Sequence, residues 1–300
     1  MKKLTFILLM LALMLTACGA EAPAEPAAPE SMPAEVENPT VMPEPTTTEI
    51  PLPTATAEPD FEPLPADAQR MTFTAEDGIE LVGYYYPASI PNAPVIVLMH
   101  WARGDQNDWV KNGMVDWLQN RSTAHGVNRP SRQSVIYPPL PEGTSFAVFT
   151  FDFRGFGESS GDFTSEGGLM DAKAAYEFAK TLESVDPARI GGIGSSIGAD
   201  GVVDGCADGC LGALSLSPGG YLGVLYAEAV TPLNQAEKPV TCVASEGDVA
   251  PANACRSASG EYYTSLIYPG TEHGTAFFYK PPENFGEVLY DWVAQIFKLE

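Results

Sequence analysis

After about residue 66, apolar residues gather in short continuous runs, and between the runs they recur at the spacing of a helix with one buried face. The runs predict strands at residues 71–74, 81–86, 94–100, 146–151, 189–194, 211–216, 240–245 and 265–268, the first two forming a hairpin around Asp77-Gly78. The helical spacing predicts helices at residues 109–118, 169–182, 197–203 and 285–297. Repeated strand and helix indicate an α/β domain with a mainly parallel sheet, whose function lies at the carboxyl ends of the strands.

The N-terminus has the pattern of a secretory signal, in which two lysines precede an apolar run, residues 4–15, that is too short to span a bilayer. The run ends in Leu15-Thr16-Ala17-Cys18-Gly19, which resembles the lipobox of a bacterial lipoprotein, where the Cys receives lipid. We therefore expect residues 1–17 to be a lipoprotein signal peptide. Cys18 would anchor an exported domain to the cell membrane, on its extracytoplasmic side. An ordinary secretory signal with an incidental Cys is the alternative.

The segment after Cys18 lacks the apolar residues that a core requires. Residues 19–65 include ten acidic residues, twelve prolines and no basic residue, so we expect residues 18–65 to be a disordered Pro/Glu/Ala/Thr-rich tether. The α/β domain then occupies residues 66–300, with 29 acidic and 14 basic residues. This negative charge repels phosphate backbones and anionic lipid, which argues against a nucleic-acid partner and against electrostatic membrane binding.

Four cysteines remain after Cys18, an even number in a chain expected to be exported, where disulfides persist. We favour the pairs Cys206–Cys210 and Cys242–Cys255, because each joins residues that the predicted elements place near each other. A metal site is one alternative, but two Cys ligands are an incomplete set and no His lies near Cys206 or Cys210 in the sequence. Free thiols are the other alternative.

One motif carries candidate chemistry. Gly194-Ser195-Ser196-Ile197-Gly198 follows a predicted strand and opens a predicted helix, the context that a GxSxG nucleophile elbow requires. In such an elbow the serine occupies a strained turn, and the flanking glycines let the backbone close. Only Ser196 holds the central position, so the sequence predicts Ser196 as a nucleophile.

A serine nucleophile needs a base, and the base needs an acid that orients it. Of the three histidines, only His273 lies in the loop between the last predicted strand and the last predicted helix, so it is the predicted base. Glu246-Gly247-Asp248 leaves the strand at residues 240–245, between the serine and the histidine in sequence. A turn through Gly247 would aim the short Asp248 carboxylate at the imidazole, which makes Asp248 the predicted acid and Glu246 the alternative.

With these residues in this order, residues 66–300 resemble the α/β-hydrolase superfamily, and within it compact serine hydrolases similar to dienelactone hydrolase and small carboxylesterases. His100-Trp101 resembles the family's His-Gly oxyanion segment, and the residues from Asp152 to Ser159 resemble its DxRGxGxS stretch. The resemblance implies the α/β-hydrolase fold, a mostly parallel eight-stranded sheet with helices on both faces. It also implies an oxyanion hole of two backbone N–H groups, that of Ile197 and that of Ala102 or Trp101, where Trp101 replaces the usual Gly.

Other polar residues near these motifs are expected to be structural: His100, Asp152 and Arg154 as loop supports, and Asp200 as a solvated or capping residue. The connection at residues 119–145 is an insertion containing Arg121, Arg129 and Arg132, which we expect to balance surface charge. The superfamily inserts its lid where residues 218–238 lie here. That length allows a short helix at residues 221–229, and so a minimal lid.

The leading hypothesis is an exported, membrane-anchored serine hydrolase that cleaves small-molecule carboxylic esters through an acyl-enzyme, with no metal or organic cofactor. A peptidase or an acyltransferase with the same triad is one alternative. A catalytically silent binding protein with the same fold is another.

Overall fold

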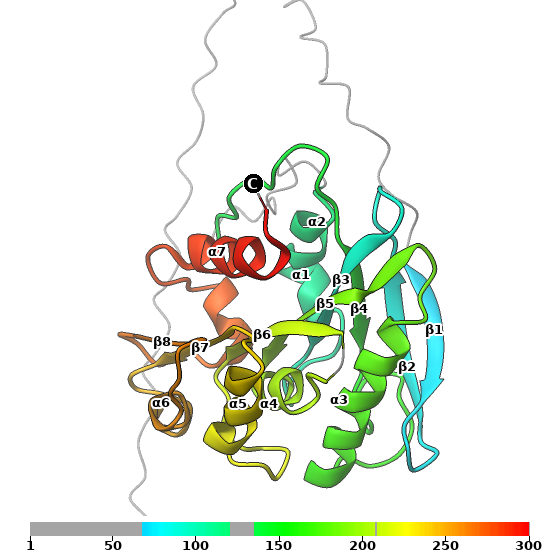
Figure 1. Cartoon of the computed structure of the whole chain (residues 1–300). Helices are drawn as coiled ribbons and strands as arrows, with labels where there is room; N and C mark the ends of the chain where they lie inside the picture. Colours follow the sequence, from blue (N-terminus) through cyan, green and yellow to red (C-terminus); the bar gives the residue numbers. More distant parts are fainter. Residues whose placement is uncertain (1–67, 121–134, 208, 300) are drawn as a thin grey trace, which may run out of the picture. The chain divides into compact units, whose positions relative to one another are not determined.

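Eight strands form one sheet in the order β1-β2-β4-β3-β5-β6-β7-β8 (Figure 1). The structure is a computed structural model and describes residues 68–120, 135–207 and 209–299. The strands are β1 (Gln69–Thr74), β2 (Glu80–Tyr86), β3 (Ala93–Met99), β4 (Ala147–Phe151), β5 (Val185–Ser195), β6 (Cys210–Leu216), β7 (Val240–Ser245) and β8 (Tyr263–Tyr268). β1 pairs with β2 and β2 with β4 in antiparallel fashion, and the other neighbouring pairs are parallel. The predicted eight-stranded, mostly parallel sheet is therefore confirmed.

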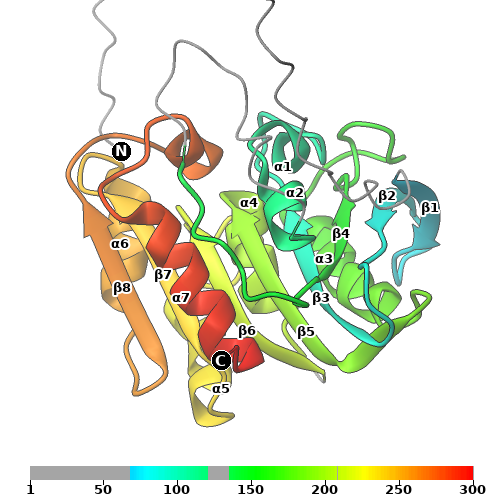
Figure 2. The same cartoon turned by 90° about the horizontal axis from the view of Figure 1, so that it is seen from above.

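Helices cover both faces of this sheet (Figure 1; Figure 2). On one face lie α3 (Ser165–Ala179), α4 (Ile197–Asp204), α5 (Tyr226–Gln235) and α6 (Val249–Ser257), and on the other α1 (Asp108–Lys111), α2 (Met114–Leu118) and α7 (Phe285–Phe297). β3 shows why the sheet needs both layers, because its successive side chains point to opposite faces. Val95 and Val97 belong to the core beneath α3 and α4, whereas Ile96 and Leu98 belong to the core beneath α2 and α7.

The prediction of a single helix at residues 109–118 is wrong. Gly113 separates α1 from α2 with a φ of 81°, in the left-handed region that glycine adopts without steric cost. α3 begins at Ser165, before its apolar spacing starts, because the Thr164 side chain accepts the N–H of Gly167 and caps the helix. Polar capping residues thus fix boundaries that apolar spacing does not reveal.

Two further helices depart from the sequence expectation. The short helix expected at residues 221–229 begins at Tyr226 and extends to Gln235, after a loop that includes Gly220 and Gly223, both with positive φ. α6, which starts directly after Asp248, is not indicated by apolar spacing, because it is built largely of small residues and exposes Val249. The position of α6 bears on function, because the helix directly follows Asp248, the predicted acid.

The carboxyl ends of β3 and β4 are joined through the buried imidazole of His100. Its Nε2 accepts the N–H of Phe153 at 3.0 Å, so Nδ1 carries the proton and donates to the Trp101 carbonyl at 2.7 Å. His100 is fully buried, and burial lowers its pKa to about 4. The structural role expected for His100 is thus observed, and it requires a neutral ring.

Protonation of His100 is expected to destabilise the fold, because it would put an Nε2–H against the Phe153 N–H. The pKa of His100 is near 4 in the folded state and near 6.5 in the unfolded state. The stabilisation that the neutral ring gives the fold is therefore complete above pH 6.5 and is lost as the pH drops toward 4. The loss attributable to His100 is roughly 3 kcal/mol across that window. In denaturant unfolding, the difference in unfolding free energy between wild type and His100→Gln should therefore become smaller from pH 7 to pH 4.5. A constant difference would contradict this assignment.

Candidate active site

Ser196 lies on the turn between β5 and α4, with φ 55° and ψ −114°. A non-glycine residue in this region is strained by about 1–3 kcal/mol and needs surroundings that enforce it. The Ser196 N–H donates to the Leu216 carbonyl at 2.8 Å, which ties the turn to β6. A Cβ at Gly194 would lie 1.9 Å from the Gly198 carbonyl oxygen, so the turn closes only with glycine there.

His273 and Asp248 come together at the carboxyl ends of β7 and β8. His273 Nδ1 lies 2.6 Å from Asp248 Oδ2, and the acid is the residue at which α6 begins. Two backbone hydrogen bonds join the exits of the strands: Glu246 N–H donates to the Tyr268 carbonyl at 2.7 Å, and Gly247 N–H to the Gly270 carbonyl at 2.8 Å. These bonds hold the two loops in register, so that the carboxylate faces the imidazole.

The alternative acid, Glu246, points elsewhere. Its carboxylate pairs with Arg256 on α6, and both side chains are largely exposed. The short side chain after the Gly247 turn therefore meets the base, and the longer one before the turn meets solvent and an arginine.

Ser196 and His273 share a cavity of about 320 Å³, lined also by Trp101, Ala102 and Arg103. The serine is 7% exposed, and the His273 side chain is 31% exposed. An imidazole bonded to a carboxylate at Nδ1 has Nε2 available as a proton acceptor. The structure thus brings the three predicted residues together: His273 bonds to Asp248 and lines the same cavity as Ser196.

The loop after β3 forms the wall opposite Ser196. The Trp101 carbonyl accepts from Gly104 N–H at 3.1 Å, which closes a turn with Ala102 and Arg103 at its centre. Among the described residues, the N–H groups of Ala102 and Ile197 have no hydrogen-bond acceptor. Ile197 begins α4, whose first amides lack helical partners. Ala102 lines the cavity, and Ile197 directly follows Ser196, which also lines it.

Asp200 corrects the sequence expectation of a solvated or capping residue. It is 1% exposed, and its carboxylate accepts the backbone N–H groups of Gly219 at 3.0 Å and of Tyr221. Burial raises its pKa to about 6. The available signal was a carboxylate between the small residues Ala199 and Gly201, on a helix whose other residues, apart from Asp204, are apolar or small. It connects the helix that begins after Ser196 to the loop that follows β6.

Asp152 and Arg154 form a structural network, as expected. Asp152 accepts the N–H of Gln106 at 2.9 Å and that of Glu158 at 3.0 Å. Arg154 pairs with Asp77 and with the fully buried Asp171. Asp152 thus joins the loop after β3 to the loop after β4, and Arg154 joins the latter to the β1–β2 turn and to α3. Neither residue lines the cavity.

Both favoured disulfides are present. Cys206–Cys210 joins the end of α4 to the start of β6, and Cys242–Cys255 joins β7 to α6. The second bond lies on the two elements that flank Asp248. No group of three or more His, Cys, Asp or Glu side chains in the described ranges could hold a metal ion.

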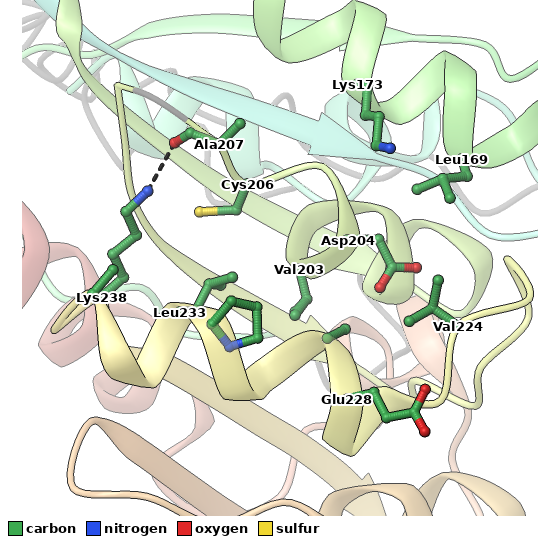
Figure 3. Close-up of a pocket in the computed structure, with 13 residues that line it drawn as sticks. Leu169, Lys173, Val203, Asp204, Cys206, Ala207, Val224, Glu228, Leu233 and Lys238 are labelled. Carbon is green, nitrogen blue, oxygen red and sulfur yellow. Dashed lines mark hydrogen bonds between the residues drawn. The ribbon is translucent and has the colours of Figure 1, made fainter.

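A second cavity, of about 400 Å³, lies between α3, the end of α4 and α5 (Figure 3). Apolar side chains from the three helices line it, with Asp204 at one side and Lys238, whose Nζ donates to the Ala207 carbonyl at 2.8 Å, at the other. Burial raises the pKa of Asp204 to about 7. None of the predicted catalytic residues lines this cavity.

Several sequence expectations concern residues outside those described. Cys18, the signal peptide, the tether and the arginines at positions 121, 129 and 132 all lie there. Within the described residues, no helix combines the length and apolar character needed to cross a bilayer.

No protein-family profile matches the sequence. The chain is similar to YfhR of Salmonella typhi, an uncharacterised protein, with 31% identity over 146 residues, 48% of this chain and 42% of that protein. Rv2307c of Mycobacterium tuberculosis, also uncharacterised, is 29% identical over 137 residues, 45% of this chain and 40% of that protein. The chain therefore spans less than half the length of these curated relatives.

Solved structures show the fold. The esterase Pf2001 of Pyrococcus furiosus matches with a TM-score of 0.56 and 16% identity, over 79% of this chain and 93% of that one. The α/β hydrolase GrgF of a Penicillium species matches with a TM-score of 0.56 and 14% identity, over 78% and 100%. Acetyl xylan esterase 1 of a Thermoanaerobacterium species matches with a TM-score of 0.53 and 16% identity, over 79% and 86%. The chain has the α/β-hydrolase fold.

Removing the Cys242–Cys255 disulfide is expected to loosen the start of α6 and so displace Asp248 from His273. A double Cys→Ala variant should lose about 3 kcal/mol of unfolding free energy and react more slowly at Ser196. Differential scanning calorimetry and the labelling rate with a serine-directed phosphonate would measure the two effects. The control is the Cys206→Ala/Cys210→Ala variant. It loosens α4 only at the end that is far from Ser196, so Ser196 should be labelled at the wild-type rate. Wild-type reactivity in the first variant would contradict the role given to α6.

Proposed function

We propose that this protein is a serine hydrolase that cleaves carboxylic esters through an acyl-enzyme, with Ser196 as nucleophile, His273 as base and Asp248 as the acid that orients the base. The observation that carries the proposal is the 2.6 Å hydrogen bond between His273 and Asp248, beside a cavity that the imidazole shares with a serine on a strained turn. The α/β-hydrolase fold supports it, as do the solved neighbours that are named esterases.

The reaction follows from the positions of these groups. Ser196 Oγ attacks the ester carbonyl carbon while His273 Nε2 takes the hydroxyl proton, and Asp248 stabilises the imidazolium without taking a proton itself. The imidazolium then donates that proton to the departing alcohol, which leaves an acyl group on Ser196. Water, deprotonated by the same imidazole, attacks the acyl-enzyme and releases the carboxylic acid.

The negative charge that develops on the carbonyl oxygen needs fixed donors. The N–H groups of Ile197 and Ala102 are the proposed pair, with the Trp101 N–H as the alternative to Ala102. Ile197 also lies at the N-terminus of α4, where the helix dipole favours negative charge. Loss of one such donor typically costs 10²–10³-fold in kcat.

A peptidase or an acyltransferase would use the same triad with another leaving group or acceptor. The named esterases among the solved neighbours favour an ester. A silent binding protein would have no use for the strain at Ser196, whose φ and ψ are enforced by close contacts on both sides. For that reason we prefer an enzyme.

The proposal extends to location and partners. The signal-like N-terminus and Cys18 support export and lipid anchoring at the cell membrane, and the acidic, proline-rich tether supports a domain held away from the lipid surface. The partner of the active site is a small-molecule ester. The net charge of −23 argues against nucleic acid.

A fluorophosphonate should label Ser196 in the full-length protein, because its phosphorus traps an activated serine in place of the ester carbonyl. Mass spectrometry should locate the adduct on Ser196, and labelling should disappear in Ser196→Ala and fall by about 10³-fold or more in His273→Ala. Ser195→Ala is the matched control and should label normally. A well-folded wild type without an adduct would refute the proposal, and parallel panels of esters and peptides would separate esterase from peptidase.

A further inference from the structure

Two aromatic rings lie near the imidazole of His273. The Trp101 ring centroid is 6.3 Å from that of the imidazole with the planes tilted by 33°, and the Tyr221 centroid is 6.5 Å away in an edge-on arrangement, at 72°. Trp101 comes from the loop after β3, and Tyr221 from the loop after β6. Two elements that are distant in sequence thus meet the base from different directions.

Each ring is fixed by its own carboxylate. Trp101 Nε1 donates to Asp108 Oδ2 at 2.8 Å, and burial raises the pKa of Asp108. Gly104 makes room for this bond, because a Cβ there would lie 1.8 Å from Asp108 Oδ2 and 2.5 Å from Trp101 Nε1. The indole is therefore held in place by a partly buried hydrogen bond as well as by packing.

Asp200 holds Tyr221 in place through the backbone N–H of the tyrosine. The Asp200 carboxylate accepts the N–H of Tyr221 and of Gly219, and the tyrosine ring folds back over Gly219, where a Cβ would lie 2.4 Å from Cζ of the ring. The same loop also touches the backbone after the base, since Ser217 Oγ accepts the Gly274 N–H at 3.0 Å. A buried carboxylate on α4 thus sets the position of a loop that contacts His273.

We propose that Trp101 and Tyr221 form an aromatic clamp on His273, with Asp108 and Asp200 as positioning residues that act through these rings. The hydrogen bond to Asp248 fixes one edge of the imidazole but lets its plane tilt about that contact. The two rings, which come from separate loops, restrict this tilt and so raise the fraction of productive geometry.

This inference rests on the proposed function for its kinetic test, in which kcat and KM for a small aryl ester are measured with the full-length protein. Tyr221→Ala should lower kcat by about tenfold to a hundredfold with KM nearly unchanged, because the ring orients the base without lining the cavity. Tyr221→Phe keeps the ring and should stay within about twofold of wild type. In Asp200→Asn, one side-chain oxygen replaces the two that accept the N–H groups of Gly219 and Tyr221. The loop should then be held less firmly, and kcat should fall about tenfold.

The coupling between these residues separates positioning from general stability. If Asp200 acts through Tyr221, the Asp200→Asn/Tyr221→Ala double variant should be no slower than Tyr221→Ala alone, whereas independent effects would multiply. Asp204→Asn is the matched control, since Asp204 is one turn further along α4, has a pKa that burial also raises, and makes no hydrogen bond to the loop. It should leave kcat unchanged, and multiplicative losses in the double variant would overturn the clamp.

A second readout needs no catalysis. The proton between His273 and Asp248 is observable by NMR as a far-downfield imidazole resonance, and its exchange with solvent reports how tightly the ring is held. Exchange should be faster in Tyr221→Ala and Asp200→Asn than in wild type and Tyr221→Phe. Faster exchange in a protein that hydrolyses no ester would leave the clamp standing and refute the proposed function. Unchanged exchange and unchanged kcat in an active enzyme would refute the clamp and leave the function standing.

Discussion

The tight turn between β5 and α4 is the constraint on which the site depends. A Cβ at Gly194 would meet the Gly198 carbonyl and a Cβ at Gly198 would meet the Met99 carbonyl, so neither can carry a side chain, and Ser196 between them has a positive φ. The fold tolerates this strained turn because β5 lies in the centre of the sheet, paired with β3 on one side and β6 on the other. Its rigidity also sets the position of α4, and therefore of Asp200, which the loop after β6 uses as an anchor.

The rest of the site is assembled from loops that are joined to one another. The exits of β7 and β8 share backbone hydrogen bonds, those of β3 and β4 share His100, and the loop after β6 bonds to the residue that follows His273. Because all five strands end at neighbouring points of a twisted sheet, short loops suffice to bring a serine, an imidazole and a carboxylate together. The disulfide between β7 and α6 adds a covalent restraint at the acid.

Much of this organisation is predictable from the sequence, because continuous apolar runs identify buried strands and GxSxG requires a strand-to-helix turn. His273 and Asp248 follow from their places after strands. The break at Gly113 and the helix α6 do not follow, since a left-handed glycine and a helix of small residues leave little trace in apolar spacing. The role of Asp200 was missed because its partners are backbone amides of a loop, which no residue pattern encodes.

α4 has a consequence for how such a protein can diverge. Of its eight residues, seven are buried, from Ile197 to Val203, so almost any substitution there disturbs packing on the sheet or the position of Ser196. Ala102 and Arg103, in the loop after β3, line the cavity from outside this helix and are exposed, so they carry fewer packing constraints. Under the proposed function, substitutions at such exposed loop positions change which esters the cavity accepts while the helix stays constant, so recognition and stability depend on different residues.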